Sequence, residues 1–340
     1  MQEILISIII PVYNRPEEIK ELLTSLTLQT NLNFEVIVIE DGSTLPCKTI
    51  TKSFEKQLNI RYIYQKNTGP AHARNHGMKE ANGNYFIFFD SDCIIPPLYI
   101  QKVIDELKSC YTDAFGGPDT AHDSFSDIQK AINYSMTSFF TTGGIRGKKQ
   151  AVGRFQLRSF NMGVSKKVFQ KTGGFGRIFP GEDPDFTLRI WKEGFQTRLF
   201  PEAFVYHKRR LSLIKFSKQV YNFGKVRPML NYFHKNYSKI TFWFPTIFML
   251  GFIFAVLFLL ISLFVPHTLL KIPILFYTLY LIIIMIDSSI ENKSLKIGFL
   301  TILTTIIQFF SYGRGFLQAQ IQINVFKKHP EKAFPENFWS

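Results

Sequence analysis

The chain has 340 residues, and 46% of them are apolar, so it can bury a sizeable core and is not a disordered protein. Its formal net charge of +14 at pH 7 indicates an anionic partner, either nucleic acid, an anionic membrane surface or a phosphorylated substrate. Nine Lys or Arg and no Asp or Glu lie between residues 203 and 240, directly before a long apolar segment. This position favours anionic membrane lipids over nucleic acid, because the cytoplasmic leaflet attracts basic residues next to a span.

The cysteines and the N-terminal residues indicate the cellular compartment of the first domain. Cys47, Cys93 and Cys110 have no metal-ligand spacing, which predicts reduced thiols in a cytosolic domain. The N-terminal apolar run has no basic flank, and Pro11 ends it after about eight residues, too few for a span or a signal peptide. We expect it to be a buried strand.

Strand and helix patterns alternate through the first half of the chain. Strands are predicted over residues 4–12, 34–39, 60–64 and 85–89. A helix is predicted after Asn14, which would be the N-cap of a capping box with Glu17, and another over 71–81. This alternation predicts an α/β fold with a mostly parallel central sheet and helices on both faces.

Three acids follow the predicted strands. Asp41, Asp90 and Asp92 fall at carboxyl ends of strands, where such sheets bind ligands. Together with the helix that starts near Ala71, they indicate a site for a metal ion and a phosphorylated ligand. Turn formation or helix capping is the alternative for any single one. Asp90 and Asp92 repel each other, so a positive group is expected between them.

Two further stretches of sequence lie between these acids and the last third of the chain. Residues 141–159 are rich in Gly, Arg and Lys and predict either a mobile loop near the site or a solvated connector. Glu182 and Asp183 then precede a helix predicted over 186–193, with Gly194 as its C-cap. One of these two acids can cap the helix, which leaves the other without a structural role.

The last third has three apolar segments, over 242–265, 268–286 and 295–313, each long enough to cross a bilayer or to be a buried core helix. Three crossings from a cytoplasmic first half would place the basic tail outside, against the positive-inside tendency. Either one segment is re-entrant or interfacial, or the rule fails here. The basic, aromatic stretch over 211–237 suits a helix in the headgroup layer or a solvated linker.

Seven short motifs, in order, carry a resemblance to a known family. They read SIIIPVYN, EVIVIEDGST, NTGPAHARNHG, DSD, RSFNMGVSKKVFQKTGGF, GEDPDFTLR and VYH, and they extend over residues 6–207. Each is weak alone, but all seven in this order are specific. The chain resembles the family 2 glycosyltransferases, which are inverting enzymes with the Rossmann-like GT-A fold.

The resemblance implies a role for each matching residue. Asp90, Ser91 and Asp92 match the DxD motif, whose carboxylates hold Mg²⁺ or Mn²⁺ against the diphosphate of a nucleotide sugar. Asp183 of the ED motif matches the catalytic base, with Glu182 beside it. The remaining implied residues are Pro11, Tyr13, Asp41, Asn67 and Arg74 for the nucleotide, Asn161, Met162 and Gly163 for donor sugar and acceptor, and His207 for the metal. A lone histidine is more often structural.

The chain differs from one part of the family in a motif that affects the expected product. Processive members have QxxRW after the ED motif, whereas residues 219–227 here have no Arg-Trp at that spacing. The resemblance therefore implies transfer of one sugar from a UDP-, GDP- or dTDP-linked donor to a polyprenyl-diphosphate-linked saccharide at the cytoplasmic face of the inner (plasma) membrane. The alternatives are a polyprenyl-phosphate monosaccharide synthase and a non-catalytic membrane-anchored binding module. No nucleic acid partner is expected.

The expected organisation follows from these segments. A catalytic domain would occupy residues 1–207, and a basic juxtamembrane segment residues 208–240. A multi-pass transmembrane region of two or three helices would occupy residues 241–313, and a tail residues 314–340.

Overall fold

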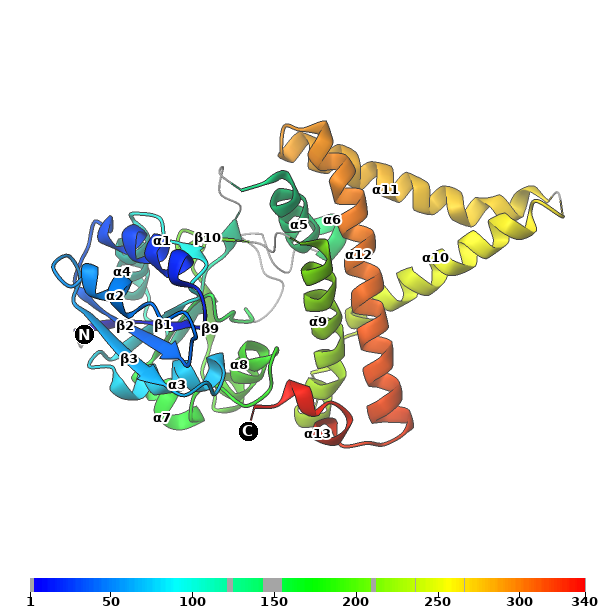
Figure 1. Ribbon diagram of the computed structural model, residues 1–340. Helices are drawn as coiled ribbons and strands as arrows, with labels where there is room; N and C mark the ends of the chain where they lie inside the picture. Colours follow the sequence, from blue (N-terminus) through cyan, green and yellow to red (C-terminus); the bar gives the residue numbers. More distant parts are fainter. Residues whose placement is uncertain are drawn as a thin grey trace. The chain divides into compact units, whose positions relative to one another are not determined.

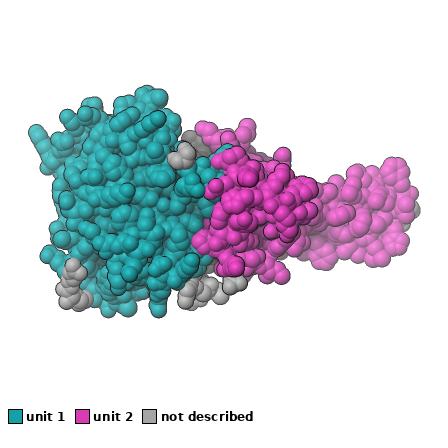
Figure 2. All heavy atoms as spheres, turned by 90° about the horizontal axis from the view of Figure 1, so that it is seen from below, with its two compact units in different colours: residues 1–122, 145–208, 336–340 teal, residues 123–144, 209–335 magenta. Residues whose placement is uncertain are grey.

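The computed structural model describes residues 3–120, 125–142, 155–208, 212–235, 237–265 and 267–339. The chain divides into two compact units, coloured separately in Figure 2. Unit 1 comprises residues 1–122, 145–208 and 336–340, and unit 2 comprises residues 123–144 and 209–335. Most of the glycine-rich stretch over 141–159 lies outside the described residues.

Unit 1 contains a seven-stranded sheet in the order β3-β2-β1-β4-β8-β6-β9. Figure 1 labels three neighbours of this sheet, β1, β2 and β3. Its strands are β1 (Ile6–Val12), β2 (Phe34–Asp41), β3 (Ile60–Gln65), β4 (Tyr85–Phe89), β6 (Ala114–Gly116), β8 (Asn161–Ser165) and β9 (Thr197–Leu199). All neighbours are parallel except β8, which is antiparallel to both β4 and β6. A small second sheet joins β5 (Cys93–Ile94), β10 (Val205–His207) and β7 (Asp119–Thr120). The prediction of a mostly parallel α/β sheet is confirmed, with one reversed strand.

Helices cover both faces of the large sheet because its central strands are apolar on both sides. Ile8 and Ile10 of β1 belong to the hydrophobic cluster that contains α1 (Pro16–Thr27) and α4 (Tyr99–Ser109). Ile9 points to the opposite face, into the cluster formed with α3 (Pro70–Glu80), α7 (Lys166–Thr172) and α8 (Glu182–Lys192). A short α2 (Lys48–Ser53) follows β2. The alternation of side chains along a strand thus builds two cores.

Two predicted helix starts were wrong. The N-cap of α1 is Arg15, with no side-chain cap bond, and not Asn14. Asn14 has a positive φ of 54°, and its side-chain oxygen instead accepts hydrogen bonds from the backbone N–H groups of Thr44 and Leu45. Asn tolerates this left-handed conformation, so a tertiary partner replaced the local cap. The helix after the ED motif begins at Glu182, four residues earlier than expected.

Unit 2 is helical. Its elements are α5 (Asp127–Thr137), α6 (Phe139–Thr142), α9 (Leu213–Phe233), η1 (Ile240–Trp243), α10 (Phe244–Ile261), η2 (Thr268–Lys271), α11 (Ile272–Glu291), α12 (Leu295–Gln320), η3 (Ile321–Val325) and α13 (Pro330–Ala333), with η4 (Pro335–Asn337) at its boundary with unit 1. Three helical stretches, Ile240–Ile261, Thr268–Glu291 and Leu295–Val325, are long and apolar enough to cross a membrane. The three apolar segments predicted from the sequence therefore form long helices.

The three candidate spans differ in what surrounds them. In their most apolar windows, 22% of the first, 6% of the second and 39% of the third is buried. The third contains α12, which packs tightly on α9: a Cβ at Gly224 would lie 2.1 Å from the carbonyl oxygen of Tyr312. On another side Thr304 of α12 lies 2.6 Å from the hydroxyl of Ser135 in α5. Most apolar side chains of α10 and α11 remain exposed.

Candidate active site

Asp41, the last residue of β2, is held by the turn that precedes α3. Its Oδ1 accepts hydrogen bonds from Nε2 of Gln65 (2.7 Å) and from the backbone N–H of Thr68 (3.0 Å). Its Oδ2 accepts one from the backbone N–H of Gly69 (2.9 Å), which has a φ of +90° that favours glycine. The carboxylate is thus fixed at the start of a helix, where N–H groups favour anions.

The other residues expected to contact the nucleotide gather at the same edge of the sheet. Pro11 is paired with Ile39 in the β1/β2 register, and Tyr13, just beyond β1, is 51% exposed. Asn67 packs so closely on Gly42 that a Cβ at Gly42 would lie 2.5 Å from its backbone nitrogen. The carboxyl ends of β1, β2 and β3 therefore bring these predicted residues together.

Arg74 joins the two acidic motifs. Its NH2 lies 2.6 Å from Oδ1 of Asp90, and its NH1 lies 3.3 Å from Oε1 of Glu182. The side chain is almost fully buried; burial lowers its pKa, but the charges of Asp90 and Glu182 outweigh this and raise it. One buried guanidinium on α3 thus neutralises a carboxylate after β4 and a carboxylate at the start of α8.

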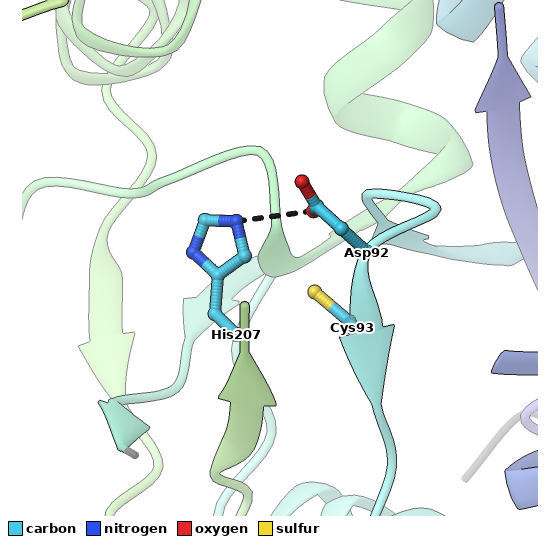
Figure 3. Close-up of side chains that lie close together, drawn as sticks. All are labelled: Asp92, Cys93 and His207. Carbon is cyan, nitrogen blue, oxygen red and sulfur yellow. Dashed lines mark ion pairs between the residues drawn. The ribbon is translucent and has the colours of Figure 1, made fainter. Parts of the chain in front are cut away.

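Asp92 has its own cationic partners. Arg15 forms an ion pair with Oδ2 of Asp92, and Nε2 of His207 lies 3.2 Å from Oδ1, as drawn in Figure 3. Burial raises the pKa of Asp92, but the charges and hydrogen bonds of His207 and Arg15 hold it well below its usual range. The positive groups expected between Asp90 and Asp92 are, in this structure, two guanidinium groups: Arg74 at Asp90 and Arg15 at Asp92.

The donor atoms around Asp92 fit a hard divalent cation in part. Ligand atoms of Asp92, Cys93 and His207 all lie within 4.8 Å of one another. Among the described residues, Oδ1 of Asp92 has no hydrogen bond of regular geometry, despite its contact with His207. Carboxylate oxygen and imidazole nitrogen suit Mn²⁺ and carboxylate suits Mg²⁺, whereas thiolate selects softer metals.

Cys93 does not fit this ligand set. Its thiol contacts the carbonyl oxygen of Phe160 at 3.6 Å. Burial raises the pKa of Cys93 well above its usual value, and the negative charges of Asp92 and Asp90 add to the shift. Sulfur suits softer metals than Mg²⁺ or Mn²⁺, and this thiol already has a protein partner. Of these three residues, Asp92 and His207 therefore fit a cation.

Glu182 and Asp183 occupy the first turn of α8. Oε2 of Glu182 accepts a hydrogen bond from the backbone N–H of Gly181 (3.0 Å), and Oδ2 of Asp183 accepts one from Ser159 (3.4 Å). Burial raises the pKa of Glu182 to about 7, with a further contribution from the charge of Asp183, while Arg74 opposes the shift. Burial also raises the pKa of Asp183. A carboxylate with a raised pKa is a better proton acceptor near neutral pH.

The predicted sugar-contacting residues lie inside the sheet. Asn161, Met162 and Gly163 are buried residues of β8. The amide of Asn161 accepts a hydrogen bond from Tyr99 (2.6 Å) and donates to the carbonyl oxygens of two loop residues, Pro118 and Ala203. In the structure, the Asn161 amide therefore forms its hydrogen bonds with other residues of unit 1. Ser91 is also buried, between Asp90 and Asp92.

Comparison with known proteins identifies the family. Residues 7–172 match the family model described as glycosyl transferase family 2. The chain carries a family 2 glycosyltransferase domain. This match agrees with the family that the motifs predicted.

Curated relatives and a solved structure agree with this family. An uncharacterized glycosyltransferase of Rickettsia felis is 38% identical over 136 residues, which are 40% of this chain and 22% of the relative. Chondroitin synthase of Escherichia coli is 30% identical over 236 residues, which are 60% of this chain and 34% of that protein. The chain thus spans a third or less of the length of these two relatives.

The solved mannosyltransferase of Pyrobaculum calidifontis, in complex with GDP-Man and Mn²⁺, has a TM-score of 0.53 at 15% identity. The similarity covers 70% of this chain and 66% of that one. At this identity it shows the fold alone, and it confirms a GT-A fold for the glycosyltransferase domain.

Two residues of the glycosyltransferase site had no role in the sequence analysis. Arg15 follows the YN of the first motif, but only the tertiary structure shows that it pairs with Asp92. Gln65, at the end of β3, donates a hydrogen bond from Nε2 to Asp41, and its Oε1 accepts one from Nδ1 of His76 (2.7 Å). The motif spacing holds no signal for either partner, because each lies more than 20 residues from the acid that it contacts.

Proposed function

We propose that the chain is an inverting, metal-dependent glycosyltransferase that moves one sugar from a nucleotide-sugar donor to a lipid-linked acceptor. The observation that supports this most directly is the position of Arg74 between Asp90 and Glu182. It brings the predicted donor-binding motif and the predicted base motif into one site. An inactive binding module would not need the buried carboxyl group of Glu182 beside the partly buried one of Asp183, both with a raised pKa.

The donor nucleotide would bind at the carboxyl ends of β1, β2 and β3. Asp41 would read the base, next to Pro11, Tyr13 and Asn67, and Arg74 would face the phosphates. Asp90 and Asp92 would hold Mg²⁺ or Mn²⁺ through carboxylate oxygens, which suit both ions, and His207, beside Asp92, would add a nitrogen ligand for Mn²⁺. When bound, the cation supplies positive charge opposite the nucleoside diphosphate.

Asp183 would act as the base. The hydroxyl oxygen of the acceptor forms a bond to the anomeric carbon on the face opposite the leaving group. The bond from that carbon to the diphosphate oxygen breaks, and the diphosphate leaves with the electron pair. Asp183 accepts the hydroxyl proton, so a single displacement inverts the anomeric configuration. Glu182, bound to Arg74 and to the Gly181 N–H, is assigned a positioning role.

The helices of unit 2 support a membrane-bound acceptor. α10 and α11 expose apolar side chains along much of their length, as expected for contact with lipid tails. Basic residues in 203–240 precede α10 and would contact anionic headgroups. A polyprenyl-diphosphate-linked saccharide at the cytoplasmic face of the plasma membrane has a lipid that such helices can bind and a sugar hydroxyl for Asp183.

The return of the chain to unit 1 constrains the membrane topology. The chain leaves unit 1 after Lys208 and re-enters it at Glu336. Both parts of one compact unit lie on one side of a membrane, so the number of crossings between them is even. α12 is the most buried candidate and packs on α5 and α9, which favours α10 and α11 as the two crossings. This arrangement keeps the basic residues after α12 on the cytoplasmic side.

The full chain in detergent with Mn²⁺ and a panel of UDP-, GDP- and dTDP-sugars tests the proposal. One donor should raise the melting temperature, and Asp92→Ala should lose that rise. The stabilising donor is then offered with polyprenyl phosphate or with a polyprenyl-diphosphate saccharide. Transfer to the bare lipid phosphate would assign a polyprenyl-phosphate monosaccharide synthase instead. If no donor stabilises the wild type, the proposed donor site is wrong.

A further inference from the structure

Residues 337–339, far from every motif of the family, form part of unit 1. The backbone N–H of Phe179 donates to the carbonyl oxygen of Asn337 (2.8 Å), and that of Trp339 donates to the carbonyl oxygen of Arg177 (2.9 Å). Ile178 and Phe338 form an antiparallel β-bridge between these bonds. The segment therefore adds a short strand to the loop that leads into the ED motif.

The Asn337 side chain secures this bridge. It is buried, and its Nδ2 donates a hydrogen bond to the carbonyl oxygen of Phe179 at 2.9 Å. With the two backbone bonds, three hydrogen bonds hold residues 337–339 to residues 177–179. Glu182 and Asp183 begin α8 only three residues later. The segment is thus anchored next to the predicted catalytic acids.

The Trp339 side chain contacts the other half of the site. A Cβ placed on Gly69 would lie 2.4 Å from an indole carbon, so the ring packs directly on the Gly69 backbone. The N–H of Gly69 binds Asp41, and Gly69 is the N-cap residue of α3, which carries Arg74. The ring of Phe179 lies on another side of the indole, with centroids 6.1 Å apart.

Trp339 therefore lies between the same two elements that Arg74 joins. Arg74 links α3 to Glu182 through charge, and Trp339 fills the space between the turn before α3 and the loop before α8. Gly69 has no side chain, so the turn itself contributes no side-chain contact at that point. A flat indole supplies a large apolar contact there without competing for the N–H that Asp41 accepts.

We propose that Trp339 is a positioning residue of the donor site, which holds the Thr68–Gly69 turn so that its N–H groups orient Asp41 toward the nucleotide. This inference rests on the proposed function, because it needs a nucleotide at Asp41. Loss of the indole should loosen the turn and weaken nucleotide binding. It should affect the chemical step less, because the backbone bridge to residues 177–179 does not require the indole.

The test compares Trp339→Ala, Trp339→Phe and Trp191→Phe in the full chain in detergent with Mn²⁺. Calorimetry measures the Kd of UDP, GDP and dTDP, and assays with the matching sugar donor measure KM and kcat. We expect Trp339→Ala to raise Kd and the donor KM about tenfold while kcat falls less than threefold, and Trp339→Phe to restore most of the affinity. Trp191, on α8 and hydrogen-bonded to Thr197, is the matched control and should leave Kd unchanged.

Binding by Trp339→Ala within twofold of the wild type would overturn the inference and leave the proposed function intact. A wild type that binds none of the three nucleotides would overturn both. If Trp339→Ala fails to fold, a double variant with Trp191→Phe and Trp243→Phe tests the inference instead. The chain has three tryptophans, so Trp339 is the one that remains in this variant and its fluorescence can be measured alone. Its emission should change as nucleotide saturates the site. Constant emission while calorimetry records binding would overturn the inference.

Discussion

Arg74 and Glu182, 108 residues apart in the chain, form a buried ion pair at 3.3 Å. The second terminal nitrogen of the same guanidinium contacts Asp90 at 2.6 Å. Arg74 therefore brings the DSD motif after β4 and the ED motif at the start of α8 together in one site. Breaking a buried pair leaves an uncompensated charge, so Arg74 should matter to stability as well as to function.

Arg74→Met should lower the free energy of unfolding by about 3–5 kcal/mol, because Glu182 and Asp90 would then lie near each other without their shared cation. Arg74→Lys should recover only part of this, since an ammonium cannot bridge two carboxylates as a planar guanidinium does. Denaturant melts of the full chain in detergent measure the change. Lys79→Met, at an exposed position of the same helix, is the control and should be near neutral. Equal stability of Arg74→Met and Lys79→Met would contradict the structural role.

Asp183→Asn should lower kcat by about 10²–10⁴-fold, because the amide cannot accept the acceptor proton. Donor-nucleotide Kd should stay within about twofold, since no predicted nucleotide contact changes. Stability should stay equal or rise, because a partly buried carboxyl group with a raised pKa is replaced by a neutral amide. Unchanged kcat in Asp183→Asn would remove Asp183 as the base. Glu193→Gln, just beyond the end of α8 and exposed, is the matched control.

The Glu182 carboxyl group should make wild-type stability fall as pH rises. Its folded-state pKa is about 7, above the usual 4.5, so between these values the folded state binds more protons than the unfolded state. Relative to Glu182→Gln, the wild type should lose stability from about pH 4.5 to about pH 7 and stay level above that. Melting curves without metal or nucleotide measure the difference. A difference that grows in favour of the wild type with rising pH would contradict the assignment.

Mn²⁺ should stabilise the protein through Asp92 and not through Cys93. At a concentration of 100 times Kd, the ion should add about 2.7 kcal/mol to the free energy of unfolding of the wild type. Cys93→Ser should keep this gain, because sulfur is a poor ligand for Mn²⁺ and the thiol contacts the Phe160 carbonyl. Asp92→Ala should lose it. Removing the ion with a chelator should return wild type and Cys93→Ser to their metal-free melting temperatures.

The tail should be on the same side of the membrane as the glycosyltransferase domain. In a chain whose native cysteines are replaced, single cysteines at His267, Lys293 and Lys332 probe the loop after α10, the loop after α11 and the tail, and all three positions are exposed. With α10 and α11 as crossings, an impermeant maleimide should label intact cells only at position 267. Labelling at 332 in intact cells would mean an odd number of crossings.

The sequence alone determined those parts of the fold that depend on local pattern. The length and β-propensity of apolar runs such as Tyr85–Phe89 predicted buried strands, and the length of the apolar stretches in the last third predicted long buried or membrane helices. Motif order was specific enough to predict the glycosyltransferase family and the acids at the strand ends. It also placed Asp41, Asp90 and Asp92 at the carboxyl ends of strands, and the structure has them at the end of β2 and directly after β4.

Only the tertiary structure decided which groups those acids meet. Asn14 had a cap pattern but bonds to the turn at Thr44 instead, because a long-range partner outweighed the local one. Asp92 pairs with Arg15 and His207, and Gly69 packs on Trp339, across 77 to 270 residues of chain. Side-chain charge and size can be read from a sequence, but a pairwise contact depends on the distance that folding leaves between two groups. No local periodicity encodes that distance, so the partners of the site appear only when the chain is folded.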